Sequence, residues 1–187
     1  MALTLDEKYK IIRSEALKQT GTDPLKIALN LMKLEAISMH GPEHHFLDGA
    51  AFLVAIRNAG GLDDIDTSLD ELAARTIRMP GAMCGYWGVC GSVTSLGSCF
   101  SILHGVGPLS DCEYYAEDME YTSRVIQKMS KIGGPRCCKR NAYISLSTAI
   151  EFLSEKYHLQ LDSSSVVCHY SVINKQCIQS RCPFFKN

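Results

Sequence analysis

The chain has 187 residues, of which 46% are hydrophobic and 21% are charged, a composition typical of a globular domain and not of a disordered segment. Its formal net charge of −1 gives no general attraction to nucleic acid or to an anionic membrane. The sequence has no run of about 20 apolar residues that would span a membrane, and its first residues lack the apolar core of a signal peptide. We therefore expect a cytoplasmic protein with one domain over residues 1–187, and neither nucleic acid nor a membrane as a partner.

Nine cysteines are the main compositional feature of the chain. In a reducing compartment, clustered cysteines indicate metal binding or catalysis and not disulfides. An odd number of cysteines also weighs against complete pairing. The positions of the cysteines therefore guide the search for a functional site.

The first 40 residues predict two helices that serve as a scaffold. Thr4 and Glu7 form a capping box for a helix that ends before Gly21. Asp23 is followed directly by Pro24, which favours the start of a second helix. We expect this second helix to continue to about residue 40.

A third helix is predicted from Pro42, and it carries His44 and His45 in its first turn. Residues 46–56 are apolar on nearly every side, which predicts a central, buried helix. A helix N-terminus lowers the pKa of an imidazole and keeps the ring neutral, the form that binds a metal or accepts a proton. We therefore expect His44 and His45 to be acid–base groups. The alternative is that they only cap the helix.

Four further helices complete the predicted core over residues 41–160. Ser-x-x-Glu capping boxes begin at Ser68 and Ser110, and they predict helices that end near residues 78 and 132. The other two helices are predicted over residues 92–104 and 141–157. In the helix that ends near residue 132, four residues are expected to face the core: Tyr114, Met119, Ile126 and Met129. The fold class is therefore mostly α, with six or seven helices and a short β element at residues 165–170.

The segment at residues 82–91 contains three regularly spaced glycines and two cysteines, Cys84 and Cys90, on either side of Trp87. Glycine at this density allows a backbone to approach a helix or a ligand closely. Metal ligation or substrate contact by Cys84 and Cys90 competes with the alternative that both are buried and inert. Trp87 is a candidate substrate-binding residue.

A Gly-Gly-Pro break at residues 133–135 precedes two adjacent cysteines and three cations, namely Cys137, Cys138, Arg136, Lys139 and Arg140. Positive charge and a helix N-terminus both favour thiolate over thiol. We therefore expect Cys137 or Cys138 to be a nucleophile, a sulfur carrier or a metal ligand, and the three cations to bind an anionic substrate. The alternative is a positively charged turn with no chemical role.

The tail at residues 161–187 carries Cys168, Cys177 and Cys182, with a proline directly after Cys182. A cysteine followed by proline is a frequent ending of iron–sulfur ligand runs. Zinc motifs usually contain two closely spaced pairs of ligands, and only one such pair is present here. We therefore predict that the three cysteines hold an iron–sulfur cluster, most simply [4Fe–4S], which docks against the cysteine pair at 137–138. Zinc is the alternative metal.

Four motifs together resemble an uncharacterised family of anaerobic bacteria and archaea. The motifs are EHHF at 43–46, CGYWGVCG at 84–91, GGPRCCKR at 133–140 and CIQSRCPF at 177–184. The resemblance covers residues 40–185, and in that family the same domain also occurs attached to methyltransferase-like domains. It implies an oxygen-sensitive cofactor and redox, sulfur or one-carbon chemistry. It supplies no catalytic residues.

The cysteine pattern supports three functional hypotheses. In the first, three cysteines leave one iron of the cluster open, and the protein is a lyase, a desulfidase or a sulfur-transfer enzyme for a small anionic substrate. In the second, a fourth cysteine from positions 84, 90, 137 or 138 closes the cluster. The protein is then a redox or sensor module for a redox or methyltransferase partner. The third hypothesis is a zinc-stabilised interaction domain.

Overall fold

The computed structural model describes residues 3–186, and within them the chain forms eight α-helices, one 3₁₀ turn and no strand. The prediction of a mostly α fold is confirmed, with more helices than expected. None of the described helices is long and apolar enough to cross a membrane. In chain order the helices are α1 (Leu5–Leu17), α2 (Pro24–Leu31), α3 (Glu43–Asn58), α4 (Ile65–Thr76), α5 (Met83–Tyr86), α6 (Gly91–His104), α7 (Glu113–Ile132) and α8 (Cys138–Tyr157), followed by the 3₁₀ turn η1 (Gln179–Arg181).

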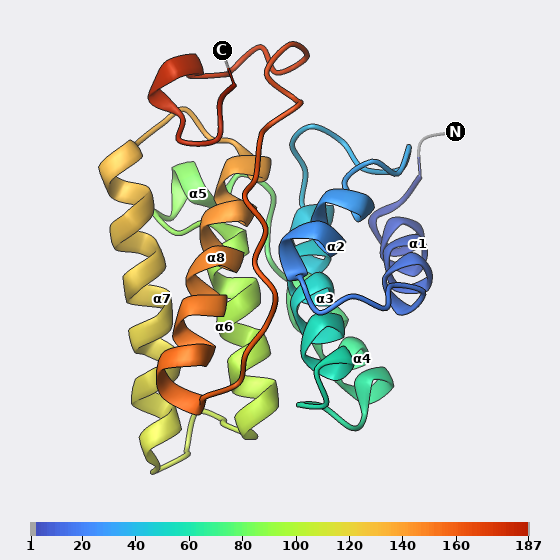
Figure 1. Cartoon of the computed structure of the whole chain (residues 1–187), viewed down its shortest axis with the longest axis vertical. Helices are drawn as coiled ribbons and strands as arrows, with labels where there is room; N and C mark the ends of the chain where they lie inside the picture. The colour runs from blue at the N-terminus through green and yellow to red at the C-terminus, as the bar shows by residue number, and fades with distance from the viewer. Residues whose placement is uncertain (1–2, 187) are drawn as a thin grey trace.

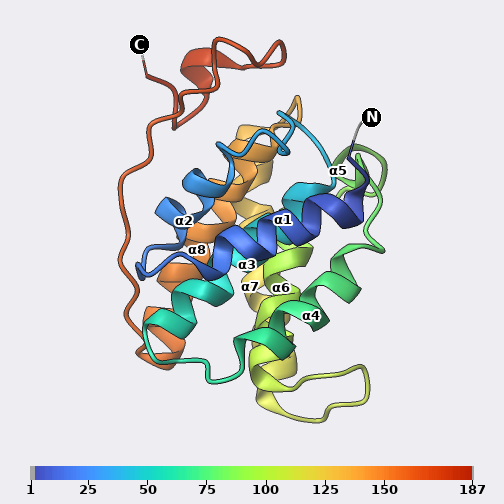
Figure 2. The same cartoon turned by 90° about the vertical axis from the view of Figure 1, so that its right-hand side faces the viewer.

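Helix α3 is the centre of the fold, as its all-round apolar sequence predicts. It is buried from Glu43 to Ile56, and α1, α2, α4, α6 and α8 all pack against it. Figure 1 shows α6, α7 and α8 side by side in one group, and Figure 2 shows α1 lying across α3. A methyl group on Gly49 would lie 2.7 Å from Ser95 Oγ, so glycine at this position permits the close approach of α3 to α6.

Helix α2 ends at Leu31, about nine residues earlier than predicted, whereas the capping box at the start of α1 is confirmed. After Leu31 the chain turns through short backbone hydrogen bonds, from Leu34 N to Leu31 O and from Ile37 N to Leu34 O. The Glu43 carboxylate then accepts hydrogen bonds from Ser38 N at 2.9 Å and from a lysine of α1 at 3.0 Å. These contacts between distant residues hold the segment in turns that the helix prediction could not anticipate.

Two of the predicted capping boxes are wrong. Helix α4 is capped by Asp64, whose carboxylate accepts a hydrogen bond from Thr67 N at 3.0 Å. Ser68 lies inside this helix and donates to Asp64 O. Ser110 accepts a hydrogen bond from Gly107 N at 2.9 Å, so it stabilises the preceding turn and does not cap α7. In both places the serine side chain forms a hydrogen bond with a nearby backbone group and does not cap the N-terminus of the helix.

The predicted core face of α7 is also wrong. Three of its four expected core residues, Tyr114, Met119 and Ile126, are exposed, and only Met129 packs against the core. The face that is buried instead carries Tyr121 and Val125. The ring of Tyr121 packs at an angle against Phe100 of α6 and Phe152 of α8, and its hydroxyl donates to Ser145 O at 3.0 Å. Both faces of α7 contain apolar residues, and this aromatic packing decides which one is buried.

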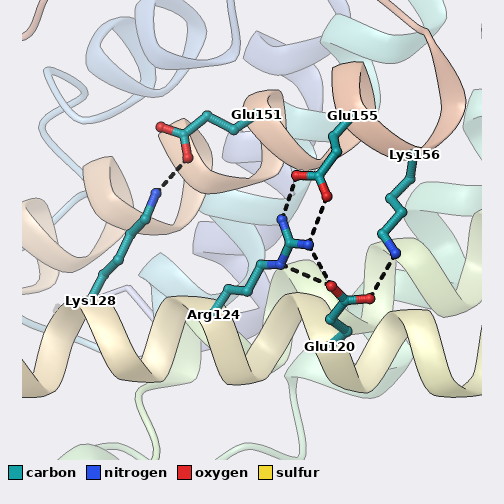
Figure 3. Close-up of polar contacts among 6 residues, drawn as sticks. All are labelled: Glu120, Arg124, Lys128, Glu151, Glu155 and Lys156. Carbon is teal, nitrogen blue, oxygen red and sulfur yellow. Dashed lines mark hydrogen bonds and ion pairs between the residues drawn. The ribbon is translucent and has the colours of Figure 1, made fainter.

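Six charged side chains join α7 to α8 on the solvent side of the bundle (Figure 3). They are Glu120, Arg124, Lys128, Glu151, Glu155 and Lys156. Arg124 binds both oxygens of Glu155, at 2.6 and 2.8 Å, and also contacts Glu120. Lys156 binds the other oxygen of Glu120 at 2.9 Å. The network therefore connects the two helices in addition to their apolar contacts.

We expect Arg124→Met to lower the free energy of unfolding by no more than about 1 kcal/mol, because ion pairs exposed to solvent contribute little. The loss should shrink at high salt, where such pairs are screened. Urea titrations at low and high sodium chloride concentration measure both effects. Arg78→Met, at an exposed arginine, is the control. A loss of several kcal/mol that is independent of salt would contradict this expectation.

After α8 the chain runs back along the helices and ends beside the first turn of α8 (Figures 1 and 2). Leu161 and Val166 pack against the core on the way. The short β element predicted at residues 165–170 is reduced to one isolated parallel bridge between Cys168 and Phe185. The tail thus returns three cysteines to the place where α8 begins.

Candidate functional site

Four cysteines from distant parts of the chain line one small cavity at the start of α8. Cys137 is the N-cap residue of α8, and the tail contributes Cys168, Cys177 and Cys182. The cavity has a volume of about 20 Å³, room for about one water molecule. Its described lining contains no carboxylate. The predicted contact between the tail and the 137–138 pair is therefore present for one cysteine of that pair.

Backbone N–H groups point at three of the four sulfurs. The donor and acceptor pairs are Arg140 N with Cys137 Sγ at 3.5 Å, Tyr170 N with Cys168 Sγ at 3.4 Å and Gln179 N with Cys177 Sγ at 3.4 Å. Asn174 Nδ2 also lies 3.7 Å from Cys137 Sγ. Hydrogen bonds of this kind stabilise negative charge on sulfur. The surroundings of the four cysteines therefore suit thiolate ligands.

The two adjacent cysteines are not the low-pKa thiols that the flanking cations predicted. Burial raises the pKa of Cys137, and it raises the pKa of Cys138 to about 12. Two of the three cations are bonded to other protein groups: Lys139 Nζ contacts Ser38 O, and the Arg140 guanidinium donates to the carbonyl oxygens of Gly133 and Pro135. Desolvation of the thiols therefore outweighs the nearby positive charge.

Cys138 lies in a different cavity from Cys137. This cavity has a volume of about 210 Å³. Its lining brings together three of the motifs found in the sequence, through the side chains of Cys84, Cys90, Cys138, His45 and Asp48. We refer to it as the three-cysteine cavity, and to the first as the four-cysteine cavity. Two cysteines that are adjacent in sequence thus belong to two neighbouring sites.

A larger cavity of about 630 Å³ adjoins the three-cysteine cavity. The two share Cys84, Cys90 and Arg136 in their linings, and the larger one has the size of a small-molecule site. Two of the three predicted substrate-binding cations line the larger cavity, the exposed Arg136 and the mostly buried Arg140. The aromatic residue in the lining is Tyr86. Trp87, the predicted one, is 65% exposed.

His44 is buried and contacts Lys139 and Ser38. Lys139 Nζ lies 3.1 Å from His44 Nε2 and 3.2 Å from Ser38 O. His44 Nε2 also lies 3.0 Å from Ser38 O, so this nitrogen contacts both a carbonyl oxygen and the Lys139 ammonium group. Burial, with a further effect of Lys139, lowers the pKa of His44 to about 3. Lys139 is only 1% exposed, and its contacts with Ser38 and His44 connect the start of α8 to the start of α3.

His45 faces the three-cysteine cavity, as expected for a functional histidine at this helix terminus. Burial lowers the pKa of His45, and its Nδ1 atom has no hydrogen-bond partner among the described residues. Gly91, the first residue of α6, packs on its ring. A methyl group at Gly91 would lie 2.1 Å from His45 Nε2.

Asp48 is the candidate residue that the sequence analysis missed. Its side chain is fully buried in the lining of the three-cysteine cavity. The Ser92 hydroxyl is close enough to lower the pKa of Asp48 but does not make a hydrogen bond of normal geometry with either carboxylate oxygen. Burial raises the pKa of Asp48 to about 7. The available signal was an acidic residue within the otherwise apolar stretch at residues 46–56. Such residues are rarely buried without a partner.

The remaining two cysteines are outside both cavities. Cys99 is buried between α3 and α6, where its thiol lies 3.6 Å from Gly49 O. Cys112 is exposed and precedes α7 as its N-cap residue. These positions indicate a packing role for Cys99 and make Cys112 a suitable control residue.

Comparison with known proteins gives one match. A family model described as a family of unknown function (DUF5714) matches residues 12–185, which include both cysteine cavities. No curated protein and no solved structure matches the chain. The chemistry of the site must therefore be argued from its own residues.

Proposed function

We propose that this chain, which belongs to the family of unknown function DUF5714, is an iron–sulfur protein whose four-cysteine cavity binds a [4Fe–4S] cluster. The ligands are Cys137, Cys168, Cys177 and Cys182. The observation that carries the proposal is the convergence of three tail cysteines on the N-cap cysteine of α8. Four cysteine ligands are the usual complement of such a cluster.

The four-cysteine cavity has room for about one water molecule, so a cluster requires the tail to move outward from Cys137 on binding. The arrangement of the sulfurs nevertheless does not suit a single metal ion. No group of three histidine, cysteine or acidic side chains within residues 3–186 is arranged to hold one ion. A zinc ion requires its sulfurs about 2.3 Å from one point, whereas in a cluster each cysteine binds its own iron. The hydrogen bonds from backbone N–H groups to three sulfurs also fit, because such bonds set the stability and reduction potential of a cluster.

The ordering of the tail supports a bound metal group. Within residues 161–186 the regular structure consists of η1 and one bridge. Fixing a residue costs roughly 1–2 kcal/mol of backbone conformational entropy. The tail buries few apolar side chains, chiefly Leu161 and Ile178. Bonds between thiolates and a metal group can supply the missing free energy.

Complete cysteine ligation favours a redox role over Lewis-acid catalysis at this cluster. When bound, the cluster would exchange single electrons with a partner. Cys137 continues directly into Cys138, so the ligand shell adjoins the three-cysteine cavity. Arg136 lines that cavity and would attract a small anionic substrate. We therefore propose a redox protein that exchanges electrons with an anion bound beside the cluster.

The test is a metal analysis of protein purified without oxygen. We expect iron and sulfide in the wild type, and a several-fold loss of both in Cys137→Ser, Cys168→Ser, Cys177→Ser and Cys182→Ser. Cys112→Ser is the matched control and should keep the wild-type content. Circular dichroism will show whether each variant retains its helices. Full iron and sulfide in all four variants, or one zinc and no iron in the wild type, would overturn the proposal.

A further inference from the structure

The three cysteines of the three-cysteine cavity come from three separate segments of the chain. Cys84 belongs to α5, Cys90 is the N-cap residue of α6, and Cys138 is the first residue of α8. Helices α6 and α8 therefore both direct their N-termini, which carry partial positive charge, toward this cavity. Asn141 Nδ2 donates to Cys90 Sγ at 3.2 Å. This environment stabilises negatively charged sulfur ligands.

The lining of the cavity contains buried polar groups that lack partners. They are His45 Nδ1 and the carboxylate of Asp48, whose only nearby side-chain donor, the Ser92 hydroxyl, lies outside normal hydrogen-bond geometry. A buried polar atom without a hydrogen bond costs about 1–3 kcal/mol, and most such atoms in folded proteins are satisfied. Several unsatisfied atoms around one cavity therefore indicate a polar or ionic ligand at its centre.

The size of the cavity and its sulfur atoms define the class of ligand. A volume of about 210 Å³ leaves room for a group of several atoms without movement of the lining. The side chains are also not arranged to hold a single ion. Soft thiolate ligands select iron–sulfur clusters, zinc or Cu(I). These observations fit a ligand that contains several metal atoms, each of which binds a different cysteine thiolate.

We infer that Cys84, Cys90 and Cys138 bind a second iron–sulfur cluster, distinct from the one proposed for the four-cysteine cavity. Three cysteine ligands leave one iron of a [4Fe–4S] cluster without a cysteine. Cys84 and Cys90 also line the adjoining cavity of about 630 Å³, which can admit a small ligand to that iron. Arg136 lines both spaces and offers a positive charge to an anionic ligand. The first cluster would then serve electron transfer and the second would bind the substrate.

Iron and sulfide content separates this inference from the proposed function. With two [4Fe–4S] clusters, the anaerobically purified wild type holds about eight irons and about eight sulfides per chain. We expect Cys84→Ser, Cys90→Ser and Cys138→Ser to reduce both contents by about half. Cys177→Ser should also halve them, by loss of the other cluster. A double variant, Cys138→Ser with Cys177→Ser, should retain almost none, and Cys112→Ser should match the wild type.

Electron paramagnetic resonance of the reduced protein gives a second readout. Two neighbouring clusters broaden each other's signals, so Cys138→Ser and Cys177→Ser should each show one narrower signal, with different g-values. Sodium cyanide should change the signal of Cys177→Ser, which keeps the open iron, and leave that of Cys138→Ser unchanged. Circular dichroism checks that both variants keep their helices.

The outcomes that contradict the inference are distinct from those that contradict the proposed function. A wild type with about four irons per chain, unchanged in all three variants of the three-cysteine cavity, would overturn the second cluster and leave the first intact. Zinc bound by Cys84, Cys90 and Cys138, or a disulfide between two of them, would likewise overturn the second cluster and leave the first intact. Iron that depends only on these three cysteines, and not on Cys177, would overturn the proposed function and support the inference.

Discussion

Phe100→Ala is expected to lower the free energy of unfolding by about 3–5 kcal/mol, the usual cost of removing a large aromatic side chain from a core. Phe100 is fully buried in α6. Its ring lies 4.6 Å from that of Tyr121, 5.3 Å from that of Phe52 and 5.4 Å from that of Phe152, measured between centroids. The variant therefore loses contacts with three other helices at once. Urea unfolding followed by circular dichroism under nitrogen measures the change.

The control for this prediction is Leu109→Ala, at an apolar residue that is 95% exposed. Its effect should stay within about 0.5 kcal/mol. A loss below about 1 kcal/mol for Phe100→Ala would mean that the neighbouring side chains refill the space. The aromatic cluster would then not be the packing centre of α3, α6, α7 and α8.

The central features of the fold could be predicted because they depend on local patterns. Because α3 is apolar on all of its faces, it must be buried on all of them, whichever helices surround it. The end of α2 could not be predicted, because it depends on Glu43, which binds Ser38 N and a lysine of α1. The buried face of α7 likewise depends on the ring of Tyr121 finding partners on α6 and α8. Both features depend on contacts with residues far away in the sequence, which the local sequence of α2 or α7 does not reveal.

The residues that line the candidate site could be found from the sequence, but their division between two cavities could not. That division depends on the position at which α8 begins. Cys137 is extended, with φ −149° and ψ 107°, and Cys138 is the first helical residue. A helix that began at residue 141, as predicted, would have left both cysteines in one loop. A difference of three residues in a helix boundary therefore changes one predicted site into two.

The residues adjacent to these cysteines show a second limit of sequence reasoning. Lys139 and Arg140 belong to a turn whose charge suggests an exposed anion site, yet both are buried and bonded to protein groups. Asp48 shows the reverse case, because its only local signal is an acidic side chain within an apolar stretch, and its burial is what makes it unusual. In each case the deciding quantity is solvent exposure, which is a property of the assembled fold.

Asp48→Asn is expected to raise the free energy of unfolding at pH 7 by about 2–4 kcal/mol, because it removes a carboxyl group that resists ionisation in the fold. The pKa of Asp48 rises from 3.8 to about 7 on burial. A shift of one pKa unit corresponds to about 1.4 kcal/mol. The buried asparagine amide would also lack hydrogen-bond partners, so the increase in the free energy of unfolding should be smaller than the free energy that corresponds to the whole pKa shift.

The pH dependence of stability gives this prediction its sharpest test. Between pH 3.8 and about 7 the folded chain holds the Asp48 proton more tightly than the unfolded chain does. Relative to Asp48→Asn, the wild type should therefore lose stability as pH rises from 5 to 7, by up to about 1.4 kcal/mol per pH unit. The buried histidines, whose pKa values are lowered, add an opposite slope that is common to both proteins. Lys139, whose pKa burial lowers to about 8, titrates above this window. Asp63→Asn, at an exposed aspartate, should keep the wild-type slope. Equal slopes for wild type and Asp48→Asn would mean that Asp48 is ionised in the native protein, so that a bound cation or a donor faces it within the three-cysteine cavity.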